Sequence, residues 1–266
     1  GSKHSIARNI TQKSQESETY NYSYSYSYYS YSTGTLENSS ATSSAQQSFD
    51  LGLKYYKGIG IPVNKPKAFE LFTEAADHGH PEAQFNVGLM YSKGDGVTKD
   101  LGKAAKYFEM ASKQNISKAK YSLGVFYLKG IGGVQKDKEK AAELFEQASD
   151  TDLKALYNIA LMYQNGYGVK KDLPKACEFF ERASEQNDSD SCFILGQIYE
   201  KGGTQVECDK TKAFNNYKKA ADLGNDKAQL SLGLMHLRGD GCAFDVEKGR
   251  QYIQMSAQQG NERAIQ

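Results

Sequence analysis

The sequence is poor in several residue types on which whole classes of function depend. Among its 266 residues there is no tryptophan, and there are only four prolines, four histidines and four cysteines. Positive and negative charges nearly cancel, leaving a net charge of +1, so the bulk charge gives no reason to expect nucleic acid as a partner. No apolar run approaches the ~20 residues that a membrane-spanning helix needs. We therefore predict a protein without nucleic-acid binding and without a membrane span.

The four cysteines do not form a recognisable site. They show neither a CxxC pair nor the spacing of metal ligands, at Cys177, Cys192, Cys208 and Cys242. Cys177 and Cys192 fall at the starts of successive expected helices, which antiparallel packing should place at opposite ends, so a disulfide between them is not expected. We predict no metal site, no cofactor and a reducing compartment, the cytoplasm. The lumen of the endoplasmic reticulum or the cell exterior is the alternative.

Beyond these absences, the chain has a regular internal period. One small residue recurs at intervals of 36, 36, 36, 36 and 37 residues, as Gly52, Gly88, Gly124, Ala160, Gly196 and Gly233. A fixed period of this length indicates a stack of structural repeats. We divide the chain into a tail, residues 1–43, and six repeats, at 44–80, 81–116, 117–153, 154–188, 189–225 and 226–262.

Each repeat predicts two helices. In the second repeat, Ala83, Val87 and Met90 lie on one face of a helix, which we call helix A, and Gly94-Asp95-Gly96 ends it. An Asn or Asp then predicts the N-cap of a second helix, helix B, at Asn64, Asp100, Asp137, Asp172, Asp209 and Asp245. At the end of helix B we expect residues that tolerate a left-handed backbone, namely Gly79, Asn115, Asp152, Asn187, Gly224 and Gly260.

The glycine inside helix A is expected to permit close contact with helix B. Glycine in a helix costs about 0.5–1 kcal/mol relative to alanine, so its recurrence needs a reason. Aromatic residues of helix B lie opposite it, at Phe72, Phe108, Phe145, Phe180 and Tyr217. Ala160 is the smallest substitute for glycine that would still fit there.

These motifs resemble the Sel-one-like repeat, a relative of the tetratricopeptide repeat. The resemblance rests on an A-x-x-x-L-G-x-x-Y-x-x-G-x-G-V pattern followed by D-x-x-K-A, and it covers about 220 residues. It implies an all-α fold, a right-handed α-solenoid superhelix of about six antiparallel helix pairs, and a scaffold or adaptor function. The fifth repeat departs from the motif, because Lys201-Gly202-Gly203-Thr204 lacks the second loop glycine. In the sixth repeat His236 replaces the motif tyrosine.

The tail, residues 1–43, has a different composition. Tyrosine alternates with serine and asparagine from Tyr20 to Tyr31, and so few aliphatic residues cannot form a core. We expect a mostly disordered tail. The alternative is a peptide that binds a groove of this chain or of a neighbour and is phosphorylated when released.

A second apolar stripe on the A helices predicts a peptide-binding groove. By analogy with tetratricopeptide arrays, the A helices line the concave side. The expected groove residues are Phe49, Leu53, Tyr56, Lys57, Phe85, Asn86, Leu89, Lys93, Tyr121, Val125, Lys129, Tyr157, Asn158, Leu161, Phe193, Lys201 and Arg238. The alternatives are packing between neighbouring A helices for the aromatic residues, and compensation of the helix dipole for the basic ones.

We predict a protein or peptide partner and no catalytic residues. The histidines, His4, His78, His80 and His236, suit turn or core positions better than catalysis, and no strand precedes a Gly-rich phosphate loop. The resemblance implies three alternatives: a weak hydrolase of the penicillin-binding type, part of a chitin synthase activator, or an adaptor in endoplasmic-reticulum degradation. The apolar C-terminal face of the last repeat also suggests self-association.

Overall fold

The computed structural model describes residues 40–265, with side chains from residue 44 onward. The expected tail therefore lies almost entirely outside the described residues. Within 40–265 the chain forms thirteen α-helices, and the one extended pairing there is an isolated bridge between Gly203 and Val206. The prediction of an all-α solenoid is confirmed. The first helix begins at Ser40, four residues before the expected boundary at residue 44.

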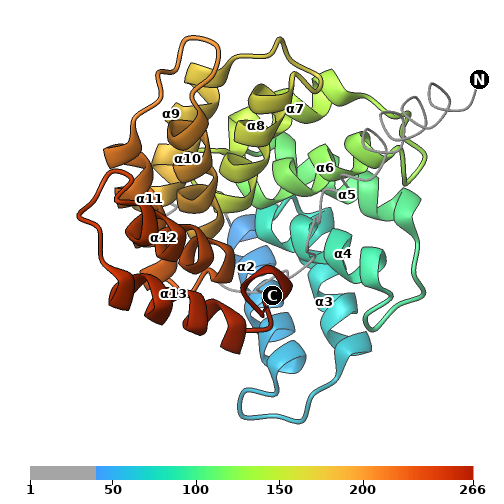
Figure 1. Ribbon diagram of the computed structural model, residues 1–266. Helices are drawn as coiled ribbons and strands as arrows, with labels where there is room; N and C mark the ends of the chain where they lie inside the picture. Colours follow the sequence, from blue (N-terminus) through green and yellow to red (C-terminus); the bar gives the residue numbers. More distant parts are fainter. Residues whose placement is uncertain (1–39, 266) are drawn as a thin grey trace, which may run out of the picture. The chain divides into compact units, whose positions relative to one another are not determined.

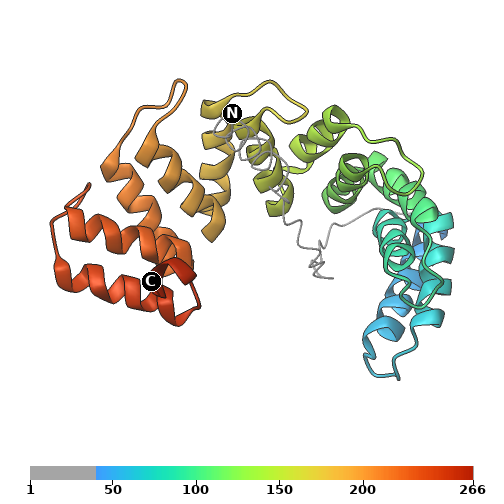
Figure 2. The ribbon, with the colours of Figure 1, turned by 45° about the vertical axis from the view of Figure 1, so that its right-hand side comes forward.

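Twelve of the helices form six pairs, which follow one another in chain order (Figures 1 and 2). The A helices are α2 Ser40–Lys57, α4 Pro81–Lys93, α6 Ser117–Lys129, α8 Leu153–Asn165, α10 Ser189–Lys201 and α12 Asp226–Arg238. The B helices are α3 Lys65–Asp77, α5 Leu101–Lys113, α7 Lys138–Ala148, α9 Leu173–Glu185, α11 Lys210–Asp222 and α13 Val246–Gln258. A short helix, α14 Glu262–Ile265, packs against α13.

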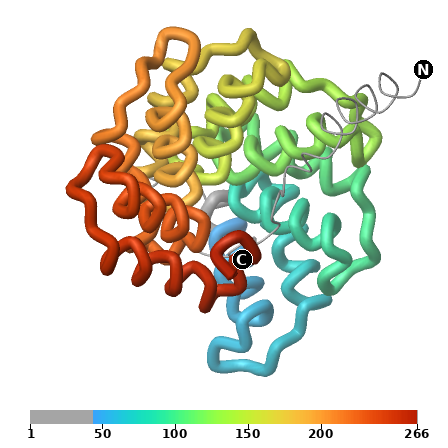
Figure 3. The backbone as a smooth tube through the Cα atoms, viewed as in Figure 1, coloured from blue at the N-terminus to red at the C-terminus, as the bar shows by residue number. Residues whose placement is uncertain are grey.

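The connectivity explains this order. Each A helix packs against the B helix of its own repeat, and each B helix packs against the A helix of the next repeat. The backbone trace makes the alternation easy to follow along the colour gradient (Figure 3). Because the extensive helix contacts join neighbours in the chain, the fold is built mainly from one pair interface and one junction, each repeated with variations.

The expected caps are present with one exception. Each of the six Asn or Asp residues before helix B accepts a hydrogen bond from the backbone N–H three residues later. After helix B, Asn115 and Asn187 have φ near +63° and +62°, and Gly79, Gly224 and Gly260 also have positive φ. Asp152 was wrongly assigned to this group: its φ is −118° and its side chain caps α8. The linker there is one residue shorter, so the same position already starts the next helix.

The glycine of helix A does contact the helix B ring, as predicted. A Cβ added to Gly88 would lie 2.7 Å from the Phe108 ring, and one added to Gly196 would lie 2.5 Å from the Tyr217 ring. Ordinary carbon contacts are wider than this, so a side chain at either position would collide with a buried ring. The close packing of the two helices therefore offsets the cost in helix stability of placing glycine in helix A.

Candidate functional site: the row along the A helices

The five aromatic residues expected in the groove form a regular series. They lie on successive A helices, and each packs against the helix B ring of its own repeat, with ring centroids 5.5–6.0 Å apart. The pairs are Phe49 with Phe72, Phe85 with Phe108, Tyr121 with Phe145, Tyr157 with Phe180, and Phe193 with Tyr217. We call these five A-helix residues the aromatic row. One side of each ring thus belongs to the core of its repeat.

Exposure differs along the aromatic row. Phe85 and Tyr121 keep 9% and 7% of their surface, whereas Phe49, Tyr157 and Phe193 are only half-buried. The surface that a partner could reach is therefore greatest in the first, fourth and fifth repeats.

The aliphatic members of the expected groove need a correction. Leu89 and Val125 are each 1% exposed, so in this structure they are core residues and present no surface to a partner. Packing of the surrounding helices covers them, which the helical spacing alone could not reveal. Their counterparts Leu53 and Leu161 are half-buried. Tyr56 is half-buried as well, and its hydroxyl donates to Asp95 of the next repeat over 2.6 Å.

The two expected asparagines behave differently. Asn86 is half-buried. Asn158 is 7% exposed, and its side-chain amide donates to the carbonyl oxygen of Lys154 over 2.7 Å. It therefore serves the backbone of its own helix, and the expectation that it would bond a peptide backbone does not fit this geometry.

The expected basic residues all lie in the last turn of an A helix. Lys93, Lys129, Lys201 and Arg238 are exposed, and Lys57 is half-buried. We call these five residues the basic row. This position stabilises the carbonyl end of a helix, whether or not the residues also bind a partner.

Lys93 lies among other charges that the sequence did not connect to it. Burial lowers the pKa of Lys93, Asp95 opposes the shift, and Lys65 and Lys154 add to it. Lys65 belongs to the first repeat and Lys154 to the fourth. Aligning the repeats compares residues at equivalent positions. Lys65 lies at the start of a B helix and Lys154 at the start of an A helix, so the alignment does not connect them with Lys93 and only the structure shows the cluster.

The electrostatic environment changes towards the fourth and fifth repeats. Burial raises the pKa of Tyr157 to about 12, and the nearby Asp190 and Asp188 add to the shift. Tyr157 thus lies near Asp190 and Asp188, whereas Lys93 lies near Asp95, Lys65 and Lys154.

Two of the histidines have structural contacts. The Nδ1 atom of His80 accepts from the backbone N–H of Ala83 at the start of α4, and its ring stacks on Phe49 at 4.4 Å. His236 is 7% exposed and stacks on Tyr252. Both positions agree with the structural roles expected from the sequence.

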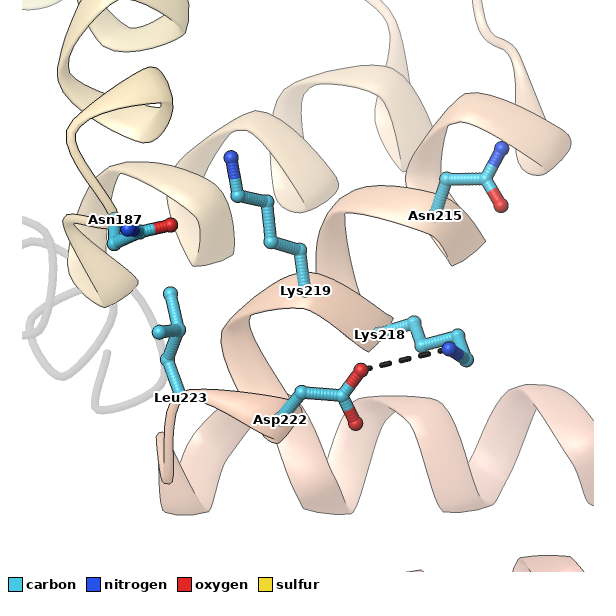
Figure 4. A pocket seen from close by; sticks show the side chains of 6 residues that line it. All are labelled: Asn187, Asn215, Lys218, Lys219, Asp222 and Leu223. Atoms are coloured by element: carbon cyan, nitrogen blue, oxygen red, sulfur yellow. Dashed lines mark hydrogen bonds and ion pairs between the residues drawn. The ribbon is translucent and has the colours of Figure 1, made fainter.

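A polar pocket of about 430 Å³ lies beside α11 (Figure 4). It is lined by Asn187, Asn215, Lys218, Lys219, Asp222 and Leu223. Its charged groups already have partners, because Lys218 pairs with Asp222 at 3.5 Å and Lys219 donates to the carbonyl oxygen of Ser184 at 2.6 Å. The pocket brings together no nucleophile and base.

A second pocket, also of about 430 Å³, lies between the fourth and fifth repeats. It includes Cys177, Cys208 and Tyr199, whose hydroxyl donates to Glu181 over 2.8 Å. Burial raises the pKa of Cys177 to about 11, which makes this thiol a weak nucleophile near neutral pH. The longer loop of the fifth repeat, which lines this pocket, was the feature of the sequence that could have indicated it.

Within residues 40–265, no group of three or more His, Cys, Asp or Glu side chains is arranged to hold a metal ion. All four cysteines are free thiols. None of the helices described is both long enough and apolar enough to cross a membrane.

Comparisons with known proteins agree with this architecture. Six consecutive segments match the Sel1 repeat, at residues 48–80, 81–116, 117–150, 153–188, 189–225 and 226–261. A protective antigen of uropathogenic Escherichia coli strains with an SLR fold is 31% identical, with a TM-score of 0.80; the match covers 84% of this chain but only 48% of the antigen. A Sel1 repeat protein from Oxalobacter formigenes is also 31% identical, with a TM-score of 0.67 and coverage of 83% and 88%.

Proposed function

Because this chain belongs to the Sel1 repeat family, whose members typically act in protein interactions, we propose that it is a non-catalytic scaffold or adaptor. In this proposal an extended segment of a protein partner lies along the A helices. The aromatic row supplies apolar contact and the basic row attracts carboxylates of the ligand.

The regularity of the aromatic row is the observation that carries this proposal. Five rings on successive helices are each held by a second ring at 5.5–6.0 Å. Side chains fixed in this way lose little conformational entropy when they bind, which favours their use as anchors. A basic residue ends the same helix in five of the six repeats. The first and fifth repeats can therefore offer both a half-buried ring and a cation.

The test should spare the core. Removing the ring of Phe85 or Tyr121 would also remove its contact with Phe108 or Phe145, and lost binding would then be confused with lost stability. The exposed lysines avoid this difficulty. We therefore choose a triple variant, Lys93→Glu, Lys129→Glu and Lys201→Glu.

The ligand can be obtained without knowing the natural partner. The full chain is used to select peptides from a random display library, and the affinity of one selected peptide is measured by fluorescence anisotropy. Reversing three surface charges, each contributing up to about 1 kcal/mol, should weaken binding about tenfold or more. The control is Lys106→Glu, Lys113→Glu and Lys170→Glu, which changes the net charge equally at exposed sites elsewhere. Equal affinities for the two triple variants, or no selected peptide, would refute the proposal.

We further propose that the protein works in a reducing compartment. The support is its free thiols, among them the exposed Cys208. The sequons at Asn115-Ile116-Ser117 and Asn187-Asp188-Ser189 provide the test, because both asparagines are exposed. In natively expressed protein we expect unmodified peptides at both sites by mass spectrometry. A glycan on either asparagine would instead assign the chain to the secretory pathway.

A further inference from the structure

The junction between successive repeats has a recurring contact. The first residue of each B helix meets the loop that ends the next A helix. Lys65 pairs with Asp95 at 2.7 Å, and the Lys138 ammonium lies 4.0 Å from the centre of the Tyr167 ring. At another junction the Leu173 side chain faces Gly203. The same two positions therefore meet across different junctions.

The residues at these two positions are chemically matched. A lysine at the start of helix B meets a carboxylate or an aromatic ring, and Leu173 meets a glycine. At the junction between the second and third repeats the corresponding residues are Leu101 and Ile131, and the Leu101 carbonyl lies against the neighbouring Gly132. The two positions thus hold a charged pair at one junction and two apolar residues at another.

The first repeat exposes one half of such a junction. Leu51 precedes the helix A glycine, and in the other repeats this position is 0–4% exposed, at Val87, Leu123, Ile159, Leu195 and Leu232. Leu51 itself is 42% exposed. Ile59, which occupies the loop position of Asp95, is 51% exposed. The α2 face thus presents an apolar surface that each later repeat covers with the preceding B helix.

The last repeat exposes the other half. Val246, the first residue of α13, is 38% exposed. Ile253 is half-buried, although the aromatic residues at the equivalent position of the other repeats are 0–2% exposed. Of the nine exposed large hydrophobic residues in the part of the chain described, seven belong to the first repeat, the last repeat or α14, and two to the four repeats between them.

We propose that these two faces bind each other between copies of this chain, head to tail. The α13 face of one copy takes the α2 face of the next, with Val246 against Ile59. This pair is apolar on both sides, like Leu101 and Ile131 inside the chain, and the contact repeats the existing junction rather than requiring a new one. A head-to-tail contact does not close on itself in a dimer, so longer assemblies follow.

Helix α14 must move for this contact to form. It lies 36 residues after the first turn of α12, at the place where a following A helix would begin, and α13 is its packing partner. Removal of residues 262–266 should therefore strengthen the association by several fold. A weaker or unchanged association of the shortened chain would contradict the proposed site.

Sedimentation equilibrium tests the association. We expect a weight-average mass that rises with concentration to about twice the monomer mass or more, where the monomer is 29.5 kDa. Ile59→Asp and Val246→Lys should each abolish the rise, because each places one charge against an apolar partner. Met110→Lys changes a side chain that is 41% exposed outside the two faces, and it should behave as wild type. Circular dichroism confirms that each variant is folded.

A mixture of the two variants provides the decisive measurement. In the mixture the unchanged α13 face of the Ile59→Asp protein can meet the unchanged α2 face of the Val246→Lys protein, and the two changed faces form a charge pair like that of Asp95 and Lys65. Mixing the two proteins should therefore restore association that neither shows alone. A monomeric wild type at every concentration would overturn the proposal. So would single variants that associate as wild type, or a mixture that fails to associate.

Discussion

The second and fourth repeats differ by one methyl group at the centre of their helix pairs. Gly88 in the second repeat corresponds to Ala160 in the fourth. The planes of Phe85 and Phe108 meet at 42°, and similar angles of 35–44° occur in the other three repeats that have glycine at this position and an aromatic pair. In the fourth repeat Tyr157 and Phe180 meet edge to face, at 68°.

This difference shows how the interface accepts a larger residue. A Cβ on Gly88 would lie 2.7 Å from the Phe108 ring as it now stands. With alanine in the fourth repeat, the ring pair is rotated and slightly wider, with centroids 6.0 Å apart instead of 5.8 Å. The row residue above it is also more exposed, because Tyr157 is half-buried and Phe85 is 9% exposed. This exposure does not follow from the alanine alone, because Phe49 and Phe193 are half-buried in repeats that have glycine at this position.

The largest expected effect comes from removing the helix B ring. Phe108 and Phe180 are both 0% exposed, and truncation of such a ring to alanine costs about 3–5 kcal/mol. The cost should be greater for Phe108→Ala than for Phe180→Ala, because the Ala160 methyl already fills part of the space. Urea denaturation gives both values. A greater loss at Phe180 would break the comparison.

An exchange of the small residues should have the next largest effect. In Gly88→Ala, overpacking of about 1–3 kcal/mol is partly offset by about 0.5–1 kcal/mol of helix propensity, so a net loss is expected. A crystal structure of this variant should show Phe85 and Phe108 turned towards the edge-to-face arrangement. Ala160→Gly should lose about 1 kcal/mol or somewhat more from propensity and the missing methyl. Unchanged ring angles in both variants would show that the methyl does not determine them.

The regular part of each repeat could be predicted from the sequence because it is local. Caps such as Asp100 act over three residues, and the contact between Gly88 and Phe108 spans only 20 positions. The same pattern recurs in each repeat, so the helices and contacts inferred for one repeat apply to the others. The prediction of a left-handed backbone at Asp152 was wrong because the shortened linker makes this residue the N-cap of the next helix. The period could not show this, since it aligns residues without specifying their backbone angles.

The candidate site was less predictable because exposure depends on several repeats at once. The helical spacing assigned Leu89 and Leu161 to the same stripe, yet one is 1% exposed and the other half-buried. The proximity of Lys93 to Lys154 joins the second and fourth repeats, and it depends on how successive junctions turn the array. No pattern within a single repeat contains that information.

A smaller effect on stability is expected at the junctions, where the contact of Asp95 in the second repeat depends on pH and the equivalent contact of Tyr167 in the fourth does not. Burial raises the pKa of Asp95, but hydrogen bonds from Lys65 and Tyr56 outweigh it, and the net shift is below the ordinary value of 3.8. The pair thus contributes full stability above the unfolded pKa and loses it as pH falls through the lower folded pKa. The corresponding Tyr167 contact contains no carboxylate.

Asp95→Asn should therefore remove part of the acid sensitivity of folding, and Tyr167→Phe should not. Lys65 is 45% exposed, so solvent limits the effect to under about 1 kcal/mol. The measurement is the urea midpoint of each variant between about pH 5 and about pH 2, where this group titrates. An unchanged pH dependence in Asp95→Asn would mean that other carboxylates dominate.

The smallest expected effect separates two explanations of the basic row. Asn165 replaces the lysine at the end of α8, is exposed and donates to Leu161, so Asn165→Lys should stabilise the fold by about 0.3–1 kcal/mol through the helix dipole. Lys93→Asn should cost less than this, because desolvation and the nearby Lys65 and Lys154 lower the pKa of Lys93 and so disfavour its charge. Thermal melts at low and high salt measure both, since salt weakens the dipole interaction. If Lys93→Asn costs as much as Asn165→Lys gains, helix stability alone accounts for this lysine. If it costs less, the charge is kept at a site where it does little for the fold, as the proposed attraction of an acidic ligand requires.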